Sequence, residues 1–330
     1  ETKEIQPHPR GVELGTLLQM LKDSQERERG GTLYNFLQEK FSRVSPSTAA
    51  ELCDMAGLTS RTKVADVEPG HAEALYKAFQ EVKLLPPPTD CLAPIGVQQL
   101  LKGMFTGVRA EFYAASSRAP EVYRGRPFLI EAAIAFGGDL AGDDTSRVIR
   151  FANRVPLLFQ QSACSSFKAV VETNWRNYDL QQPRGALPVG PLVIMIHMAS
   201  VWVPFTSESK EAIADYDEIR EEMSLALKEC GRKLKTYLNR RQAMRRAGER
   251  RTIFLRYIGE VSKAAADLTG GEAQAIYDAL MATAQKKTAQ MDQVLDEEGR
   301  VVDSDKDESV YIASSADSSG SDTDAPTDVS

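Results

Sequence analysis

The 330-residue sequence has few of the residues that bind metals or form disulfides. It contains four cysteines and three histidines, and the cysteines are far apart with no CxxC pair. Structural metal sites and disulfide frameworks need such residues in close pairs. We therefore expect no metal site, and we interpret the cysteines as reduced, mostly buried thiols of a cytoplasmic protein. His197 lies inside an apolar run and is expected to be a hydrogen-bonded core residue.

Long hydrophobic runs are also absent. The longest mainly apolar run, 192–203, has twelve residues and already contains His197 and Ser200. A membrane-spanning helix needs about 20 apolar residues, so we expect no membrane partner. The chain starts with neither a methionine nor an apolar signal segment, which we interpret as the boundary of a fragment. With 42% hydrophobic residues, it can still bury the cores of two domains.

The net charge of −7 hides a segregation of charge along the chain. Residues 296–330 contain eleven acidic residues against two basic ones, so this tail carries −9 and the remainder carries +2. Within the remainder, residues 231–251 contain nine arginines and lysines against one glutamate. Such a run is either a solvated helix face or a surface for phosphate groups, and its imbalance favours phosphate attraction. The candidate DNA-binding cations in it are Arg232, Lys233, Lys235, Arg240 and Arg241.

Apolar residues at helical spacing predict an all-helical domain over residues 1–83. Stripes of leucine, phenylalanine and valine recur four times at spacings of three and four, with breaks at Gly30-Gly31 and Gly57. Thr32 is the expected N-cap of the second helix. The proline-rich stretch 84–95 cannot continue a helix and is predicted to be a stiff linker.

Residues 96–214 have a different pattern, which predicts an α/β domain. A short helix is expected at 97–104 and a longer one at 162–174. Apolar segments bounded by proline and glycine predict strands at 128–136, 148–151, 156–159 and 192–203. Strands around a helix indicate an α/β layer, so the fold class expected for the whole chain is α+β.

Residues 215–251 predict one long amphipathic helix, since apolar residues from Ile219 to Leu238 recur at spacings of three and four. At about 1.5 Å per residue, this helix would extend about 50 Å and project as a stalk. Further helices are expected in 252–295. The acidic tail, 296–330, has too little apolar content to fold and is predicted to be disordered.

Two polar features flank the last predicted strand. In the loop WRNY, the side chains of Trp175, Arg176 and Tyr178 could grip a duplex backbone. Because tryptophan is mostly buried in proteins, Trp175 is equally consistent with a core anchor, which leaves Arg176 as the better contact. Lys210 follows the strand on a polar turn that leads into the long helix. As an ordinary surface lysine in the first turn of a helix, it would be disfavoured by the helix dipole. A residue that breaks a local rule is a candidate functional residue, although Lys210 is also consistent with an ordinary surface lysine.

Long stretches of the sequence resemble the C-terminal part of the DNA topoisomerase VI B subunit. The likeness covers about residues 7–268 and is carried by long, non-repetitive segments: HPRGVELGTL at 8–17, RFANRVPLLFQQSAC at 150–164, WRNY at 175–178 and VPFTSESKEAIADYDEI at 203–219. The WRNY loop resembles the Trp-Lys-x-Tyr DNA-contact loop of that family, with Arg176 in place of the usual lysine.

The resemblance implies a fold for each part of the chain. Residues 1–83 would be a helix–two-turn–helix domain, and 96–214 would be a transducer domain with a left-handed βαβ, ribosomal-protein-like fold. Residues 215–251 would form a stalk helix, and the helices of 252–295 would dock the A subunit of topoisomerase VI. The implied partners are double-stranded DNA, this A subunit and a second copy of the B subunit, in an A2B2 heterotetramer.

The resemblance also implies an activity and a location. The enzyme would be an isomerase that relaxes supercoiled DNA by ATP-dependent double-strand breakage, passage and rejoining, in the cytoplasm with the nucleoid. Lys210 resembles the family's switch lysine, which reaches the γ-phosphate of ATP. The site for ATP with Mg²⁺ would lie mainly in an N-terminal ATPase domain, and the cleaving tyrosine would lie in the A subunit.

One departure from the family pattern limits what this chain could do alone. No Glu-x-x-x-Asn box and no Asp-x-Gly-x-Gly motif precedes His8, so we expect the ATPase domain to be missing and the chain to hold no catalytic residue. We interpret the chain as a C-terminal fragment that supplies DNA sensing and relays ATP-driven dimer closure to the cleaving A subunit. The alternative is a stand-alone DNA-binding or scaffold protein that reuses these domains.

Overall fold

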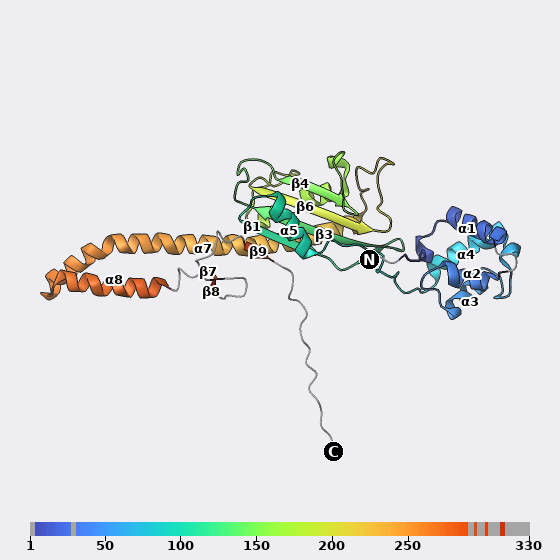
Figure 1. Ribbon diagram of the computed structural model, residues 1–330, viewed down its shortest axis with the longest axis horizontal. Helices are drawn as coiled ribbons and strands as arrows, with labels where there is room; N and C mark the ends of the chain where they lie inside the picture. Colours follow the sequence, from blue (N-terminus) through green and yellow to red (C-terminus); the bar gives the residue numbers. More distant parts are fainter. Residues whose placement is uncertain (1–3, 28–30, 290–293, 296–300, 303–310, 314–330) are drawn as a thin grey trace, which may run out of the picture.

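The computed structural model describes residues 4–27, 31–289, 294–295, 301–302 and 311–313 (Figure 1). Helices form a compact unit near the N-terminus, a mixed sheet forms the middle, and one very long helix runs along the sheet and projects beyond it. No helix within these ranges is long and apolar enough to cross a bilayer. Nor does any group of three or more His, Cys, Asp or Glu residues within them suit a metal ion. All four cysteines are free and three are buried, as predicted.

The N-terminal unit is the helical bundle that the apolar stripes predict. It begins with a short 3-10 turn, η1 (Pro9–Gly11), and η2 (Val64–Asp66) precedes its last helix. Its four helices are α1 (Leu14–Arg27), α2 (Leu33–Lys40), α3 (Pro46–Met55) and α4 (Pro69–Glu81). Thr32 Oγ1 accepts a hydrogen bond from the Asn35 backbone N–H at 3.3 Å, which confirms the predicted N-cap. The helices share one core that includes Leu37, Leu52, Leu75 and Phe79.

The sheet is mixed, with the strand order β5-β4-β6-β3-β1-β9 and with β2 paired to β3. Its strands are β1 (Phe112–Ser117), β2 (Glu121–Tyr123), β3 (Arg126–Phe136), β4 (Arg147–Ala152), β5 (Val155–Pro156), β6 (Leu192–Ser200) and β9 (Tyr311–Ala313). The central strands β3 and β6 are antiparallel, from Phe128↔Ser200 to Phe136↔Leu192. Strands β4 and β6 are parallel and are joined through η3 (Gln161–Ala163) and α6 (Ser165–Glu172), which makes a βαβ unit.

Helices cover both faces of this sheet, so β3 is almost wholly buried. Ile130 and Ile134 share a core with α6 and α7, whereas Ala133 and Ala135 share a second core with α5 (Val97–Gly107). Neighbouring residues on a strand point to opposite faces. Glu131 is therefore on the α5 side, although it lies in an otherwise apolar strand.

Glu131 fixes the end of the proline-rich linker to the sheet. Its carboxylate accepts hydrogen bonds from the backbone N–H groups of Ile95 and Gly96, at 2.8 and 2.7 Å, directly before α5. It also accepts one from Nδ1 of His197 at 2.8 Å, because Nε2 of that ring accepts the N–H of Arg154 at 3.1 Å. Burial raises the pKa of Glu131, but these donors outweigh it and hold the pKa below its ordinary value. His197 is thus the hydrogen-bonded core residue that we predicted.

Helix α7 (Asp217–Thr269) is longer than predicted, and the boundary expected at residue 251 is wrong. No proline and no pair of glycines interrupts the segment, so nothing stops the helix at the end of its amphipathic part. It ends at Gly270, which adopts the left-handed conformation (φ 70°) that favours glycine at helix ends. Helix α8 (Ala273–Ala289) then folds back along α7 (Figure 1).

Other differences concern the strands. The sequence pattern does not predict β1 or β2, and the strand expected at 156–159 stops at Pro156. Beyond it, the buried Arg150 Nη2 donates to the carbonyls of Leu157 and Phe159, both at 2.9 Å, in place of strand pairing. Short pieces of the tail pair as strands. Strand β9 pairs with β1, whose edge offers free backbone groups, and β8 (Val301–Val302) pairs with β7 (Val294–Leu295), just before the tail, in a separate two-stranded sheet. The disorder predicted for the rest of 296–330 lies outside the described residues.

Candidate nucleic-acid interface and lysine turn

The WRNY loop forms a short 3-10 turn, η4 (Trp175–Tyr178), whose two aromatic side chains are buried. Trp175 is 0% exposed, and its indole N–H donates to the Val170 carbonyl at 2.8 Å. Tyr178 is 9% exposed and packs edge-to-face on Trp175, with ring centroids 6.1 Å apart. The expectation of direct DNA contact by Trp175 is therefore corrected in this conformation, because its polar atom already has a partner in the core. Both rings instead anchor the loop.

The anchored loop is packed tightly against α7 at Gly231. A Cβ atom at this position would lie 2.5 Å from ring atoms of Tyr178, so only glycine permits the observed contact. Lys235, one turn further along α7, donates from Nζ to the Asn177 carbonyl at 2.8 Å. The structure therefore joins two features that are far apart in sequence: the aromatic loop and the start of the basic run.

Arg176 is exposed, as is its neighbour Asn177. Its Nε and Nη2 donate to the Gln182 carbonyl at 2.9 and 2.5 Å, and no carboxylate lies within 4.0 Å of it among the described residues. Hydrogen bonding to one carbonyl orients the guanidinium but leaves its positive charge without a counter-charge, which suits an anionic partner.

The basic run of α7 does not form a single basic face. At about 100° per residue, positions 228, 232, 235, 246 and 250 share one side of the helix. All five are exposed cations, and we call them the basic stripe: Lys228, Arg232, Lys235, Arg246 and Arg250. The first part of the stripe lies beside η4, since Lys235 reaches Asn177 and the charge of Arg232 acts on Tyr178. The sequence analysis missed Lys228 because this residue precedes the basic run of 231–251. Its spacing of four residues from Arg232, one helical turn, could have identified it.

The remaining predicted cations point to other sides of α7. Lys233 is half-buried: its Nζ donates to the Ala115 carbonyl at 2.9 Å and lies 3.8 Å from Glu229. The expectation that Lys233 contacts DNA is corrected, because the ammonium group is already bound at the sheet. Arg241 forms an ion pair with Glu111 at 2.7 Å, and Arg240 is exposed. The side chain of Arg251 lies outside the described residues.

Lys210 lies in a tight turn after β6, seven residues before α7 begins. The turn is closed by a bridge between Phe205 and Ile213 and by the Thr206 N–H, which donates to the Ala212 carbonyl at 2.9 Å. Lys210 itself has a left-handed backbone (φ 55°), and its N–H donates to Ser207. The polar turn predicted for Lys210 is therefore confirmed, whereas the alternative of a first helical turn is wrong, and with it the argument from the helix dipole. The exposed ammonium makes no hydrogen bond or ion pair with any described residue.

An ion-pair network fixes the end of this turn to α6 and α7. Arg220 contacts Asp215 and Asp217 and lies 3.0 Å from Glu172, while Lys168 Nζ lies 2.9 Å from Asp215. Burial raises the pKa of Asp215, but Lys168 and Arg220 outweigh it and hold the pKa below its ordinary value. The Lys210 turn is thus tied to the helices that carry the WRNY loop and the basic stripe.

Comparisons with known proteins fit this arrangement. Residues 87–250 match the family model of the topoisomerase VI B subunit transducer. The B subunit of type 2 DNA topoisomerase 6 from Methanococcoides burtonii is 44% identical over 265 residues, which cover 80% of this chain and 42% of that protein. Proteins of the same name from Archaeoglobus fulgidus and Pyrobaculum aerophilum are 44% and 36% identical, over 72% and 79% of this chain and 39% and 48% of theirs.

Among solved structures, the B-subunit of the DNA gyrase from Myxococcus xanthus overlaps 38% of this chain and 37% of its own at 15% identity. The TM-score of 0.28 is too low to support an argument.

The sheet with its βαβ unit, the anchored loop and the long helix define a transducer domain, a class that the family model matches over most of this region. The chain belongs to the family of topoisomerase VI B subunits. It spans about two fifths of the length of the Methanococcoides relative, 42% of that protein.

Proposed function

We propose that this chain supplies the DNA-sensing and transducing part of the B subunit in a type II DNA topoisomerase of the VI class. Such an isomerase relaxes supercoiled DNA by ATP-dependent double-strand breakage, passage and rejoining. The observation that carries the proposal is the joining of Arg176 to the basic stripe through the contacts of Tyr178 with Gly231 and of Lys235 with Asn177. Membership of the topoisomerase VI B-subunit family supports the proposed transducing role and the isomerase activity.

The proposed duplex contact is electrostatic. The basic stripe and Arg176 present cations on one side of the molecule, and cations that meet phosphates release counterions from DNA. No base-reading side chain is needed for an enzyme that senses duplex geometry rather than sequence. Arg240 is a further candidate because it is exposed, whereas Trp175, Tyr178, Lys233 and Arg241 support the interface from behind.

A matched pair of variants on neighbouring positions tests the DNA interface. Arg232→Ala should weaken binding of a labelled duplex about threefold and lower the salt dependence of the logarithm of affinity by about 0.9, the loss of one phosphate contact. Lys233→Ala removes the same charge from the sheet side and should leave that slope unchanged, with a loss of about 1 kcal/mol in stability. Equal slopes for the two variants would reject the stripe as the DNA-binding surface.

Lys210 is proposed to contact the terminal phosphate of ATP. An exposed ammonium on a rigid turn, with no partner among the described residues, suits a phosphate group. ATP with Mg²⁺ would supply the energy of the cycle and would be bound mainly by residues outside this chain. The part proposed for Lys210 is to bind that phosphate and to pass its presence or absence to α6 and α7 through the Asp215–Arg220 network.

Activity in the assembled enzyme tests Lys210. The full-length B subunit carrying Lys210→Ala, mixed with its cleaving partner, should relax supercoiled plasmid at least about tenfold more slowly with ATP, because one phosphate contact is lost. DNA affinity should stay within about twofold, since Lys210 lies outside the stripe. Normal relaxation would remove Lys210 from the mechanism.

The finer expectations remain part of this proposal. We propose a helix–two-turn–helix identity for α1 to α4, a left-handed βαβ connection in the transducer, and an A2B2 assembly in the cytoplasm with the nucleoid. The distal part of α7 has large apolar side chains about half exposed, which supports docking of the A subunit there. They are Ile253, Phe254, Tyr257 and Val261.

A further inference from the structure

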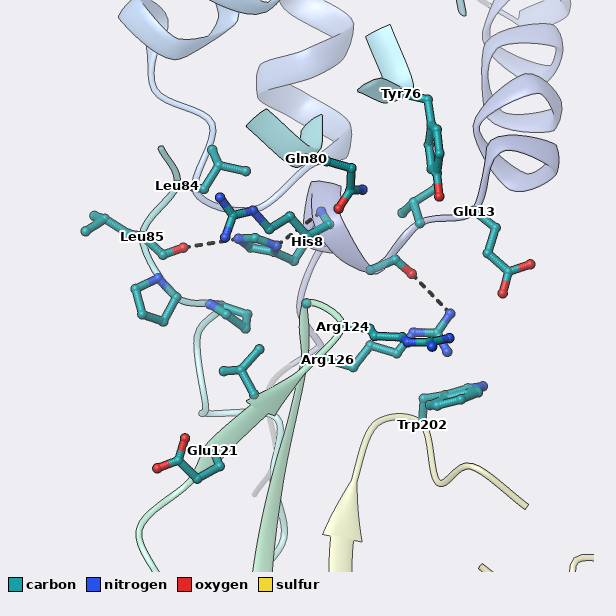
Figure 2. Close-up of a pocket in the computed structure, with 17 residues that line it drawn as sticks. His8, Glu13, Tyr76, Gln80, Leu84, Leu85, Glu121, Arg124, Arg126 and Trp202 are labelled. Atoms are coloured by element: carbon teal, nitrogen blue, oxygen red, sulfur yellow. Dashed lines mark hydrogen bonds between the residues drawn. The ribbon is translucent and has the colours of Figure 1, made fainter. Parts of the chain in front are cut away.

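A cleft of about 710 Å³ separates the N-terminal helices from the transducer sheet (Figure 2). Its walls come from segments distant in sequence. On one side are η1 with the residues between it and α1, Tyr76 and Gln80 of α4, and the beginning of the linker. On the other side are the tip of the β2–β3 hairpin and Trp202, which follows β6. None of these residues belongs to the WRNY loop or the basic stripe.

The two walls touch through a pair of glycines, which fixes the shape of the cleft. Gly125 at the hairpin tip has a left-handed backbone (φ 71°), and a Cβ there would lie 2.4 Å from the Gly11 nitrogen. The guanidinium of Arg126 donates to the Gly11 carbonyl at 3.1 Å across the same junction. The close approach of two backbones therefore requires glycine, and the hydrogen bond orients Arg126 into the cleft.

The linker wall is held just as firmly. Arg10 donates to the Val82 carbonyl at 3.0 Å, Arg43 donates to Pro86 at 2.9 Å, and His8 Nε2 lies 3.1 Å from the Leu85 carbonyl. These bonds fix the first part of the linker, as Glu131 fixes its end. The cleft is thus preformed between two walls rather than a gap between loosely tethered domains.

The chemistry inside the cleft is cationic and aromatic. Arg10, Arg124 and Arg126 line it, and among the described residues no carboxylate oxygen lies within 4.0 Å of any of the three guanidinium groups. Arg126 stacks over Trp202 at 4.0 Å, and Arg124 lies 5.2 Å from the Tyr123 ring centroid. Figure 2 shows Arg124 and Arg126 reaching toward Trp202, between the two walls.

Two acidic residues also line the cleft, but neither forms an ion pair with its three arginines. Glu13 acts on Arg126 only at a distance, and Glu121 lies away from the arginines in Figure 2. Burial lowers the pKa of Arg126, Glu13 offsets this only in part, and the like charge of Arg124 lowers the pKa further. Arg126 is half-buried and the neighbouring Arg124 is exposed, and two adjacent guanidinium groups without a counter-ion are unfavourable unless an anion joins them.

We propose that this cleft is a second DNA-binding site, in which Arg124 and Arg126 bind a backbone phosphate of the duplex between the helical unit and the transducer. Guanidinium groups match phosphate oxygens in a bidentate manner, and the exposed edge of Trp202 offers a surface to the adjoining sugar. The inference rests on the proposed function in that the ligand is DNA. A duplex that contacts the cleft as well as the basic stripe would bridge both domains of the chain.

The test compares Arg124→Ala with Arg147→Ala in the full chain. Arg124 makes no hydrogen bond to another described residue, so its loss spares the Gly11–Gly125 junction. Arg147 is an exposed arginine at the start of β4 and controls for the loss of one charge. Arg124→Ala should weaken binding of a labelled duplex about three- to tenfold and lower the salt slope by about 0.9. Arg147→Ala should change affinity by less than about twofold.

Tryptophan emission gives a second, local measurement. The chain has two tryptophans, of which Trp175 is buried and Trp202 is partly exposed in the cleft. DNA should change the emission of the unmodified chain and of Arg147→Ala, and Trp202→Phe should abolish this change.

Several results would overturn the cleft site. These are equal salt slopes for Arg124→Ala and Arg147→Ala, an emission change that Trp202→Phe does not reduce, or an Arg124-dependent binding of inorganic phosphate with unchanged duplex affinity. The Arg232→Ala variant separates the two proposals. If it weakens DNA binding while Arg124→Ala does not, the basic stripe stands and the cleft site falls.

Discussion

The two halves of α7 have the same backbone conformation but very different surroundings. From Asp217 to Leu238 the helix buries Ile219, Met223, Leu227 and Leu234 against the sheet and α6. Beyond that half it projects from the sheet, and α8 lies along it (Figure 1). There Leu268 is 88% exposed, while Ile258 is buried. The first half is held by a core, and the second half continues because nothing in its sequence stops it.

In the proposed function, this difference lets one helix both contact DNA and transmit a signal to a partner. A half packed on the sheet is rigid and can position Arg232 and Lys235 of the basic stripe against the WRNY loop. A projecting half gains little from burial and depends on helix propensity, on exposed pairs such as Arg245–Glu249, and on a partner. Variants placed at equivalent positions in the two halves should therefore have different effects.

The largest expected difference concerns leucines. Leu227→Ala removes a side chain that is 0% exposed and should lower the free energy of unfolding by about 3 kcal/mol, from lost burial and the cavity left behind. Leu268→Ala, in the projecting half, should change it by less than about 0.5 kcal/mol. Urea unfolding followed by circular dichroism measures both. Similar losses would mean that the distal half is packed as firmly as the proximal half.

Replacing a glycine by alanine should lower stability in the first half of α7 and raise it in the second half. Gly231→Ala places a methyl group 2.5 Å from the Tyr178 ring and should destabilise the chain by about 1–3 kcal/mol, with some displacement of the WRNY loop. Gly248→Ala meets nothing within 4 Å and should stabilise the helix by about 0.5–1 kcal/mol. Thermal unfolding of the two variants decides the matter. A neutral or stabilising Gly231→Ala would contradict the tight packing of η4 on α7.

The smallest effect is expected from the ion pairs at the start of α7, and it should depend on pH. The pKa of Asp215 is lower in the folded chain than in the unfolded chain, so its contribution is present above the unfolded pKa and is lost as the pH falls through the folded pKa. Asp215→Asn should therefore cost about 1 kcal/mol at neutral pH. The gap between variant and parent should narrow as the pH is lowered below about 4. In the distal half, Glu249→Gln should show almost no such pH dependence because its pair with Arg245 is exposed.

Local patterns were sufficient for much of the fold. The four N-terminal helices, β3, β4, α6, most of β6 and the start of α7 could be predicted because apolar periodicity reports which side of an element is buried. Strand β1 could not, because its sequence FYAASS is short and largely made of small residues. The end of α7 was missed because amphipathicity fades where the helix leaves the sheet, although the helix itself continues.

The residues of the candidate site also fall into those whose role the sequence could predict and those whose role it could not. Arg176, Lys210 and the basic run could be singled out from composition and from resemblance to a family. Whether Trp175 faced solvent or the core could not, since a tryptophan in a loop suits both. The roles of Lys233 and Arg241 depended on contacts with Ala115 and Glu111, which are more than a hundred residues away in sequence. Glu131 carried a usable signal, a charged residue in an apolar strand, but its donors Ile95 and Gly96 come from the linker.

The sequence by itself determined the helices, the central strands, the segregation of charge and the family, because these depend on neighbouring residues and on motifs read along the chain. Only the tertiary structure decided which cations of α7 face solvent and that the aromatic loop is seated on Gly231. It also decided that Gly11 and Gly125 join the two domains around a cleft that holds Arg124 and Arg126. The reason is physical: a side chain's partner is set by the packing of distant segments, and no local pattern encodes that distance.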